Sequence, residues 1–210
     1  MTAVHSATLA AAFDEVLLGR RSVRKYRADP VSEEDVAAIV ERARWAPSPH
    51  NSEPWRFVIL RNLPAKERLA LAMGDVWRRD LTRDGLAPDA VQAEIDASHR
   101  RIVEAPVIIL ACLVAEGLDE YPDAQRQLNE QMMAAHSLGA AVQHIMLAAY
   151  ARGLGTCWMC APLFCPETVV AALDLPADFW PQGLITVGYP EAWPKARKRR
   201  PMPELSFEVA

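Results

Sequence analysis

The fold is decided by the stretch between residues 20 and 55, which begins RRSVRKY (residues 20–26) and ends APSPHNSEPW (residues 46–55). The first part places four cationic side chains within six residues, directly after a segment with helical spacing of apolar residues. The second part carries three prolines, whose stiffness lowers the entropy cost of holding hydroxyl and amide groups in place. Together they predict a grip for an anionic cofactor. Two plainer interpretations stay open, since charge runs are usually solvated and a proline-rich loop can be a rigid corner before a strand.

The composition is that of one domain without a general affinity for nucleic acid. A chain of 210 residues with 51% hydrophobic content can bury a full core, so we predict a single domain over residues 1–210. The formal charge of -4 and a pI near 5.8 disfavour the basic surface field that nucleic-acid binding needs. Any cationic site must therefore be local.

Cysteine usage and the N-terminus indicate a reducing cytoplasm. Residues 1–19 lack the basic start of a signal peptide. The four cysteines are predicted to be free thiols: Cys112, Cys157, Cys160 and Cys165. The longest apolar run, residues 107–115, is about half of the roughly 20 residues that a membrane helix requires. We therefore expect a soluble, cytoplasmic protein with no membrane contact.

Apolar periodicity and capping residues outline the secondary structure. Ser32, followed by three acidic residues, caps a helix that ends by Trp45, because Pro47 disfavours helical geometry in the residue before it. Helices are also predicted at residues 7–18, 65–81, 88–104, 124–152 and 166–173, and strands at 55–60, 107–114, 156–160 and 184–187. The helix at 88–104 is polar almost all round, which indicates a surface element such as a lid.

The helix at residues 124–152 and the C-terminal tail both suggest contacts beyond a simple core. The helix is apolar on nearly every side and rich in small residues, which is typical of a core centre or a dimer seam. His136 and His144 lie eight residues apart on it, too far for joint metal ligation, so core or interface roles are favoured. In the tail, a basic run precedes strand-like alternation at residues 205–209, which predicts docking on its own sheet or on a partner subunit.

Two cysteine and glycine patterns are weak signals. Cys157 and Cys160 have the C-x-x-C spacing of redox and zinc sites, but a strand turns residues three apart to opposite faces, and no second ligand pair follows. A thiol function stays the minor alternative, and no metal site is expected. Gly153-Leu154-Gly155 lacks the third glycine and the acidic residue of a dinucleotide-binding motif, so we interpret it as a helix stop.

Four motifs stand in a recognisable order and spacing: RRSVR (20–24), APS (46–48), NSEPW (51–55) and GLGTCW (153–158). They resemble the nitroreductase family of flavin enzymes, over about residues 8–203. A closer similarity runs through WRRD (77–80), DG (84–85), EAP (104–106), YPD (121–123) and GLITVGYP (183–190). It resembles the flavin-binding C-terminal domain of the bifunctional enzyme that makes coenzyme F420, a domain that reduces the dehydro precursor of this deazaflavin. No ligase domain precedes it here, which implies the reductase half standing alone.

The resemblance implies an α+β fold, in which a mixed, mainly antiparallel sheet is flanked by helices. It also implies an intertwined homodimer with an FMN in each of two sites at the subunit interface. In such a dimer the helix at 124–152 would be the seam. A lid or excursion would span about residues 65–104, and a C-terminal arm at about 191–210 would extend over the partner.

The family's flavin contacts carry over to matching positions. Arg20, Arg21 and Ser22 would hold the phosphate and ribityl chain, and Arg199 would close on the phosphate from the tail. Arg24 would lie near the flavin N1 and O2, where negative charge accumulates on reduction. No catalytic side chain is implied, because flavin N5 carries the chemistry.

Further contacts are implied at the ring end of the flavin. Pro47, Ser48 and Asn51 would approach from the other subunit, and the main chain around Cys160 and Ala161 would meet the N5 edge. Two departures from the family bear on the choice of substrate. They are Glu53, where glutamine is common, and Cys160, where closer relatives have glycine.

The resulting hypothesis is an FMN-dependent oxidoreductase with a ping-pong mechanism. A reduced nicotinamide or deazaflavin donor gives hydride to the flavin and is replaced by a small conjugated acceptor, for which dehydro coenzyme F420-0 is favoured. Trp77 would stack on this acceptor, Arg78 would pair with its phosphate and Asp80 would lie beside them, although all three could equally be an ordinary helix end. The alternatives are a generic NAD(P)H-dependent nitro- or quinone reductase, a related flavin-fragmenting enzyme, or a non-enzymatic module that binds a phosphorylated ligand or nucleic acid.

Overall fold

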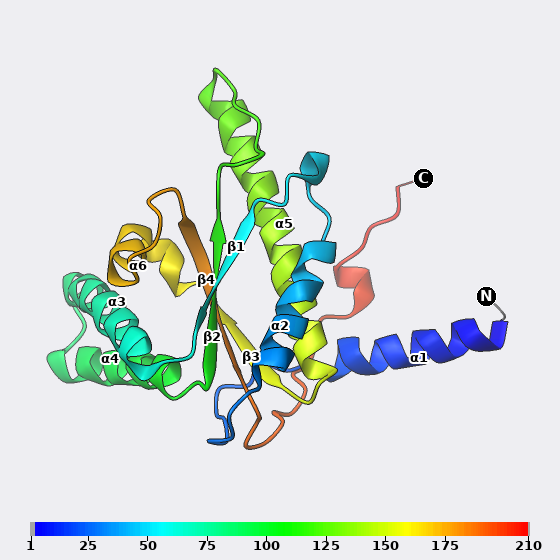
Figure 1. Ribbon diagram of the computed structural model, residues 1–210, viewed down its shortest axis with the longest axis horizontal. Coiled ribbons are helices and arrows are strands. Elements are labelled where there is room, and N and C mark those ends of the chain that lie inside the picture. The colour runs from blue at the N-terminus through cyan, green and yellow to red at the C-terminus, as the bar shows by residue number, and fades with distance from the viewer. Residues whose placement is uncertain (1–2, 210) are drawn as a thin grey trace.

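The computed structural model describes residues 3–209 and shows helices on both faces of one sheet (Figure 1). Ten helices and strands follow one another with short 3-10 turns between some of them. In chain order they are α1 (Ala3–Gly19), α2 (Glu33–Glu41), β1 (Trp55–Leu60), α3 (Leu63–Arg83), α4 (Pro88–Val103), β2 (Val107–Leu113), α5 (Ala124–Tyr150), β3 (Gly155–Met159), α6 (Pro166–Ala172) and β4 (Trp180–Gly188). Every helix and strand predicted before residue 190 is therefore present within a few residues of its expected bounds.

The sheet has four strands in the order β1-β2-β4-β3, and each neighbouring pair is antiparallel. All seven residues of β2 are buried, as its continuous apolar sequence predicted for a strand covered on both faces. The parallel element of the expected mixed sheet is one isolated bridge between Ser22 and Thr156, beside the edge strand β3. The α+β class and the mainly antiparallel sheet are thus confirmed.

Two helical layers enclose the sheet (Figure 1). On one face α2 and α5 pack over the strands, with Ile39 and Ile145 fully buried. On the other face α3, α4 and α6 contribute Leu69, Ile102 and Val169 to a second apolar cluster. By length and mean hydropathy α5 could cross a membrane, a test that core helices of soluble proteins also pass, and here its inner face forms the core.

The expected polar character of α4 is a correction. Val91, Ile95 and Ile102 are buried on one side of this helix, and it packs alongside α3 as a helical hairpin. Only a few apolar positions are needed to seat a helix on its neighbour, so the excess of polar residues concealed a one-sided pattern. The α3–α4 segment therefore belongs to a packed layer, and its action as a lid stays a prediction.

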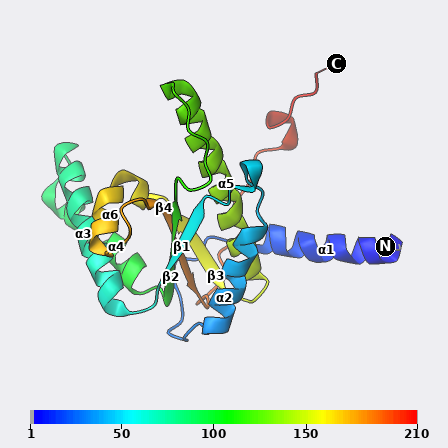
Figure 2. The same ribbon diagram turned by 45° about the horizontal axis from the view of Figure 1, so that its top comes forward.

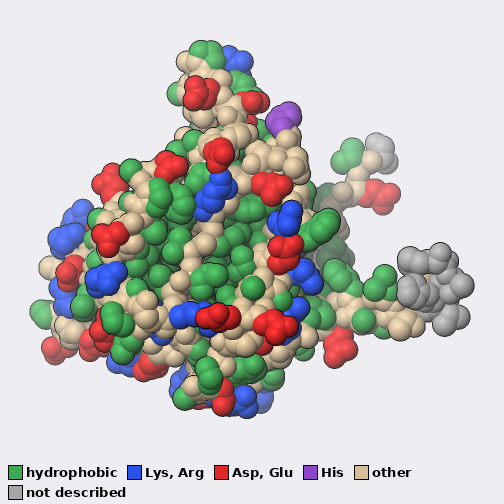
Figure 3. Space-filling model, viewed as in Figure 1, with side chains coloured by type: hydrophobic (Ala, Val, Ile, Leu, Met, Phe, Trp, Pro, Cys, Tyr) green, Lys and Arg blue, Asp and Glu red, His purple; other side chains and the backbone are tan. Residues whose placement is uncertain are grey.

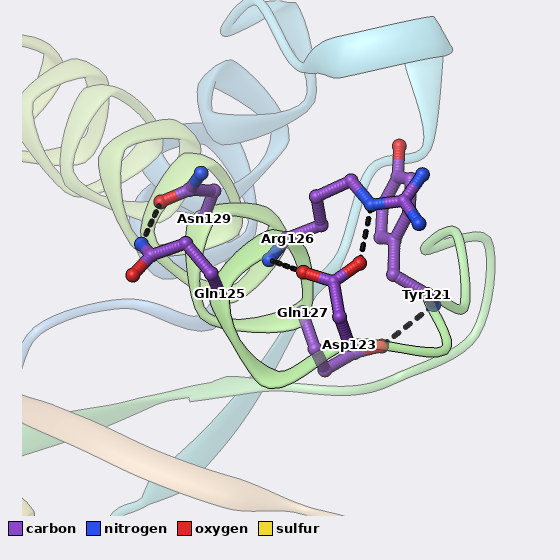
Figure 4. A network of polar contacts seen from close by, with 6 residues as sticks. All are labelled: Tyr121, Asp123, Gln125, Arg126, Gln127 and Asn129. Atoms are coloured by element: carbon purple, nitrogen blue, oxygen red, sulfur yellow. Dashed lines mark hydrogen bonds and ion pairs between the residues drawn. The ribbon is translucent and has the colours of Figure 1, made fainter.

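Capping explains where several helices begin. The Ser32 hydroxyl accepts the Asp35 N–H at the start of α2, as predicted, and the Asp123 carboxylate accepts the Arg126 N–H at the start of α5. Asp123 also pairs with the Arg126 guanidinium, which lies over the Tyr121 ring (Figure 4). The pKa of Asp123 is lowered mainly by the hydrogen bond from the Arg126 N–H and next by the bond from the Arg126 side chain. The network holds the loop before α5 against the N-terminal end of that helix.

The helix α1 and the C-terminal tail of the described chain extend away from this body (Figures 1 and 2). The side chains of α1 are exposed along most of its length, including Leu9, Phe13 and Leu18. The strand-like tail is a correction, because residues 205–209 form no strand and Phe207 is 88% exposed. Alternation alone does not make a strand unless the segment lies along a sheet edge that supplies hydrogen bonds. Docking of the tail on its own sheet is therefore wrong for the described residues.

Candidate functional site

A cavity of about 480 Å³ lies where the segment after α1 meets the C-terminal tail. Its walls come from both ends of the chain. One lining side chain, Glu191, is acidic. Seven are cationic: Arg20, Arg21, Arg24, Lys25, Lys195, Arg197 and Arg199. Because the whole chain carries a net charge of -4, this concentration of positive charge is local, as expected for a site that binds an anion.

Backbone hydrogen bonds bring the two cationic segments together. The N–H of Val23 donates to the Thr156 carbonyl of β3 at 2.9 Å, which fixes the first segment along the sheet edge. Glu191 N–H donates to the Lys25 carbonyl at 3.2 Å, which ties the start of the tail to the same segment. The two sets of cations therefore face one cavity because their main chains are bonded side by side.

A tight junction at the end of α5 fixes the approach of both termini. Gly19 lies so close to Tyr150 that a Cβ at residue 19 would overlap the tyrosine ring and hydroxyl. The Tyr150 ring also meets Trp193 edge to face, with ring centroids 5.0 Å apart. Tyr150 thus joins the last residue of α1 to the tail beside the cavity.

Arg20 is the cation most deeply placed in this cavity. Its Nε atom is buried, and no hydrogen-bond partner reaches it among residues 3–209. Burial, followed by the nearby charges of Arg199 and Arg21, lowers the pKa of Arg20. The hydroxyl of Thr156, beside Ser22, is likewise buried without a partner among the described residues. The charge of Arg20 nevertheless contributes to the cationic wall of the cavity.

The other lining arginines differ in how firmly they are held. Arg21 donates to the carbonyl oxygens of Leu18 and Arg20, so its guanidinium also caps the end of α1. Arg24 makes only a long contact, 3.5 Å, to the Ser22 carbonyl. The guanidinium of Arg24 is therefore freer to turn toward a bound molecule.

The predicted residues of the proline-rich loop lie outside this cavity. Pro47 and Ser48 line a separate cavity of about 310 Å³ with Met133, His136 and Ser137 of α5. The Ser48 hydroxyl accepts the Glu53 N–H at 3.1 Å, and Asn51 donates to the Glu53 carboxylate at 3.3 Å.

The same loop holds an unusual backbone conformation. His50, Asn51 and Glu53 have positive φ angles of 53°, 54° and 45°, which side-chain-bearing residues adopt at a cost of about 1–3 kcal/mol each. Such a conformation persists where the surroundings impose it, and it is common at ligand-binding loops. The stiffness predicted from the prolines is thus accompanied by strain that the sequence did not reveal.

Cys160 and Ala161 lie at the opposite end of β3 from the cationic cavity. A strand rises about 3.3 Å per residue, which puts Cys160 about 13 Å from Thr156. The cysteines of the chain are free, as predicted. Burial raises the pKa of the Cys157 thiol, with smaller opposing effects from Arg24 and Arg101, so this thiol is protonated at neutral pH.

The three residues expected to bind the acceptor have other partners. Arg78 of α3 donates to the Gln92 side chain of α4 at 2.9 Å, and Asp80 pairs with Arg83. Trp77 is half-buried on the same helix, and none of the three lines the cationic cavity. No group of three metal-ligating side chains lies close together in the part of the chain that the structure describes.

Comparison with known proteins identifies the family. Residues 17–189 match the family described as the nitroreductase family. The chain belongs to the nitroreductase family. The family's matched region includes the first cationic segment, the proline-rich loop and all four strands.

Two curated relatives of this nitroreductase-family chain are similar along most of their length. A 5,6-dimethylbenzimidazole synthase of Rhodospirillum rubrum is 34% identical over 196 residues, which cover 91% of this chain and 85% of the relative. An NADH dehydrogenase of Thermus thermophilus is 32% identical over 206 residues, which cover 86% and 88%. The family members that resemble this chain therefore carry different activities.

Solved structures share the nitroreductase fold. A BluB-like flavoprotein from Clostridium difficile 630 superimposes with a TM-score of 0.78 at 22% identity and covers 94% of this chain and 98% of its own. A nitroreductase from Desulfovibrio desulfuricans in complex with FMN gives a TM-score of 0.71 at 28% identity, with coverage of 94% and 96%. These neighbours confirm the nitroreductase-like fold that the motifs implied.

Proposed function

We propose that this protein holds the phosphate of FMN in the cationic cavity and works as a flavin oxidoreductase with alternating substrates. The enzyme class and the cofactor are confirmed at the level of the family, by the family match and by the FMN complex of the D. desulfuricans relative. The non-enzymatic alternative is thereby wrong. The observation that carries the residue assignments is the cavity itself, in which Arg20, Arg21 and Ser22 meet Arg199 from the other end of the chain.

The cavity suits a phosphate monoester by charge and by donor chemistry. Arg20, Arg21 and Ser22 supply guanidinium, hydroxyl and main-chain donors from one side, and Arg199 closes from the tail. Charge-assisted hydrogen bonds from guanidinium to phosphate are stronger than neutral ones and are often paired. Arg24, at the rim with a weakly held guanidinium, would orient the flavin ring through its N1 and O2 edge.

The strand β3 then sets the direction of the cofactor. Its first residues adjoin Ser22 and Val23, and its far end carries Cys160 and Ala161 about 13 Å away. A cofactor that lay along this strand from the cationic cavity would bring its ring toward the main chain after Met159. When bound, FMN supplies hydride transfer at N5, and the protein's own part is to bind, orient and exclude water.

We further propose a homodimer in which each site takes residues from both copies. Pro47, Ser48 and Asn51 do not reach the cationic cavity of their own chain, and α1 and the tail expose apolar side chains away from the body. Hydrophobic side chains also gather over the middle of the face around β1 (Figure 3). Exposed apolar surface of this extent is typical of an interface. The loop of one copy would complete the ring end of the site in the other.

For the donor we propose a reduced nicotinamide, with a reduced deazaflavin as the other candidate, and for the acceptor a small conjugated molecule. The relatives support a nicotinamide donor, since one is named an NADH dehydrogenase. Dehydro coenzyme F420-0 stays a candidate acceptor on the motif similarity alone. Its proposed partner Arg78 would have to leave Gln92 to bind it.

A second candidate function is favoured by a specific observation. The R. rubrum relative, 34% identical, is a 5,6-dimethylbenzimidazole synthase. Its name makes the flavin-fragmenting alternative as well supported as a reductase of added acceptors. For both functions we propose a reducing cytoplasm, in keeping with four free thiols.

The deciding experiment begins with the absorbance spectrum of the purified protein. We expect flavin bands and one FMN per chain; a colourless protein that takes up no FMN would end the proposal. Anaerobic reduction by NADPH or NADH is followed by air, nitrofurazone or dehydro coenzyme F420-0, and the products are analysed. Turnover of nitrofurazone alone indicates a generic reductase, loss of flavin with release of 5,6-dimethylbenzimidazole indicates fragmentation, and reduction of the deazaflavin precursor supports the motif-based acceptor.

A further inference from the structure

The cationic part of the C-terminal tail, residues 192–200, has few contacts that hold it in place. The last main-chain hydrogen bond before it joins the Glu191 N–H to the Lys25 carbonyl. Within residues 3–209, no hydrogen bond and no ion pair involves residues 192–200. Yet the cationic cavity is lined from this segment by Lys195, Arg197 and Arg199. Another kind of contact must therefore keep the segment beside the cavity.

Electrostatic forces within the empty cavity act against this placement of the tail. Burial and, next, the charge of Arg199 lower the pKa of Arg20, so the two guanidinium groups lie close enough to repel each other. Seven cationic side chains line the cavity, and Glu191 is the acidic one among the described lining residues. Like charges gathered in one place destabilise a compact arrangement. The contact that holds the tail must therefore offset this repulsion.

An aromatic contact lies at the base of the cationic tail segment. The ring of Trp193 meets the ring of Tyr150 with centroids 5.0 Å apart and an interplanar angle of 72°, an arrangement that aromatic pairs prefer. Trp193 stands between Glu191, which is bonded to Lys25, and the cations that begin at residue 195. The residue after it is Pro194, which restricts Trp193 to extended geometry. The ring contact therefore fixes where the cationic stretch begins.

Tyr150 is a firm support for this contact. It is the last residue of α5, and the residue before it, Ala149, is fully buried. The carbonyl oxygens of Ala149 and Tyr150 accept the N–H groups of Leu154 and Gly153, both at 2.9 Å. Gly19 also lies against the Tyr150 ring, where a Cβ at residue 19 would overlap it. The core helix and the end of α1 thus set the position of the ring that Trp193 meets.

We propose that Tyr150 and Trp193 are positioning residues of the phosphate site, whose ring contact holds the cationic tail segment over the cavity and slows the release of FMN. Neither ring needs to touch the cofactor. The inference rests on the proposed function and deepens it, because it names what keeps Arg199 within reach of the phosphate. A plainer role for Trp193 is to cover apolar surface at the end of α5. That role predicts a loss of stability that does not depend on Arg199.

The first test measures how firmly the tail is held, by limited digestion of the full chain with trypsin. Trypsin cuts after lysine and arginine, and the segment offers such bonds after Lys195, Arg197, Lys198 and Arg199. Without FMN and again with saturating FMN, Trp193→Ala should be cut there about 3- to 10-fold faster than the wild type. Trp193→Phe keeps a ring and should stay within about twofold of the wild type.

The matched control for this digestion is Trp45→Ala. Trp45 is 74% exposed on the turn after α2 and does not line the cationic cavity. Its removal takes away a tryptophan of the same kind without touching the tail. Cleavage of the tail in this variant should proceed at the wild-type rate.

The second test measures the release of FMN by rapid-mixing flavin fluorescence. Trp193→Ala should release FMN about 3- to 10-fold faster, and Trp193→Phe at close to the wild-type rate. Arg199→Ala should speed release in the wild-type chain but add less than about twofold in the Trp193→Ala chain, because a loosened tail no longer brings this arginine to the phosphate. Arg21→Ala should speed release equally in both chains, since this guanidinium is held by the carbonyl oxygens of Leu18 and Arg20.

The proposal is overturned if Trp193→Ala leaves tail cleavage and FMN release at wild-type values. It is also overturned if the effects of Trp193→Ala and Arg199→Ala multiply, as a loss of stability unrelated to the phosphate would give. Thermal unfolding checks that each variant is folded, and Trp193→Leu replaces Trp193→Ala in the same comparisons if the alanine variant is not. A wild-type protein that takes up no FMN would instead defeat the proposed function, while its digestion would still decide whether the ring contact holds the tail.

Discussion

The cationic cavity and the proline-rich loop, residues 47–54, were both expected to bind one flavin, yet within a single chain they do not face the same cavity. The cavity assembles within the chain: Val23 is bonded to Thr156, Lys25 to Glu191, and cations from both ends face one space. The loop is equally well formed, held by the Ser48 hydroxyl on the Glu53 N–H, but it faces a different cavity against α5.

The difference indicates a division of labour. Under the proposed function, one chain would hold the phosphate by itself, whereas the ring end would need the loop of the other copy. A rigid, strained loop with no ligand in its own chain is what a second copy would use. The following tests break or sharpen that contrast.

The largest effect is expected on removing residues 195–210. This deletes Lys195, Arg197 and Arg199 from the cavity, and charge-assisted hydrogen bonds contribute about 1.5–3 kcal/mol each. FMN affinity should fall by more than about 100-fold, and the apolar tail would be lost from any dimer contact. Equilibrium dialysis and light scattering measure the two changes. A truncated protein that stays dimeric and keeps its FMN would show that the tail contributes neither to FMN binding nor to the dimer contact.

Arg20→Ala should weaken FMN binding by about 10- to 150-fold. The substitution removes the most buried cation of the cavity and the donor that lacks an acceptor among the described residues. Flavin fluorescence on dilution measures the affinity. Arg44→Ala removes the same charge outside the cavity and should leave it unchanged. Equal losses in the two variants would mean that only overall charge matters.

Ser48→Ala should have a smaller effect, about fivefold on FMN affinity. The Glu53 N–H loses its acceptor, which costs about 1 kcal/mol, and the strained loop relaxes.

A mixed dimer of this variant with Arg20→Ala sharpens the test. If the loop serves the other copy, a mixed dimer keeps one intact site and one doubly damaged site. If it serves its own chain, both sites are singly damaged. Titration of FMN into tagged, purified mixed dimers distinguishes one tight site from none.

The smallest effect is expected for Cys157→Ser, less than about twofold on FMN binding and flavin reduction. Burial raises the pKa of this thiol, so it is neither a thiolate nor a metal ligand at neutral pH. Thermal unfolding checks that the variant folds. An inactive but folded serine variant would support the minor thiol alternative.

Much of the fold was predictable because its signals are local. Ser32 and Pro88 mark helix starts, Pro47 marks a helix end, and the unbroken apolar run of β2 predicts burial on both faces. Where a signal needed a partner elsewhere, prediction failed. Alternation at residues 205–209 found no sheet edge, and the buried side of α4 was recognisable only once α3 lay beside it.

The site divides in the same way. Arg20, Arg21, Ser22 and Arg199 were identified because motif and charge mark them, and the structure brings them to one cavity. Lys195 and Arg197 were not singled out for the site, since a basic run near a terminus is ordinary in sequence. Their place in the cavity depends on the main-chain bond from Glu191 to Lys25, a long-range contact that no spacing rule reveals.

The helix α1 has a practical consequence for how this protein must be made. Leu9, Phe13 and Leu18 are more than half exposed on a rod that projects from the body (Figure 1). A newly synthesised chain therefore exposes apolar surface until another molecule covers it, and this exposed surface promotes aggregation. Dilution, which would separate the proposed dimer and expose α1, should promote aggregation of the purified protein as much as warming does.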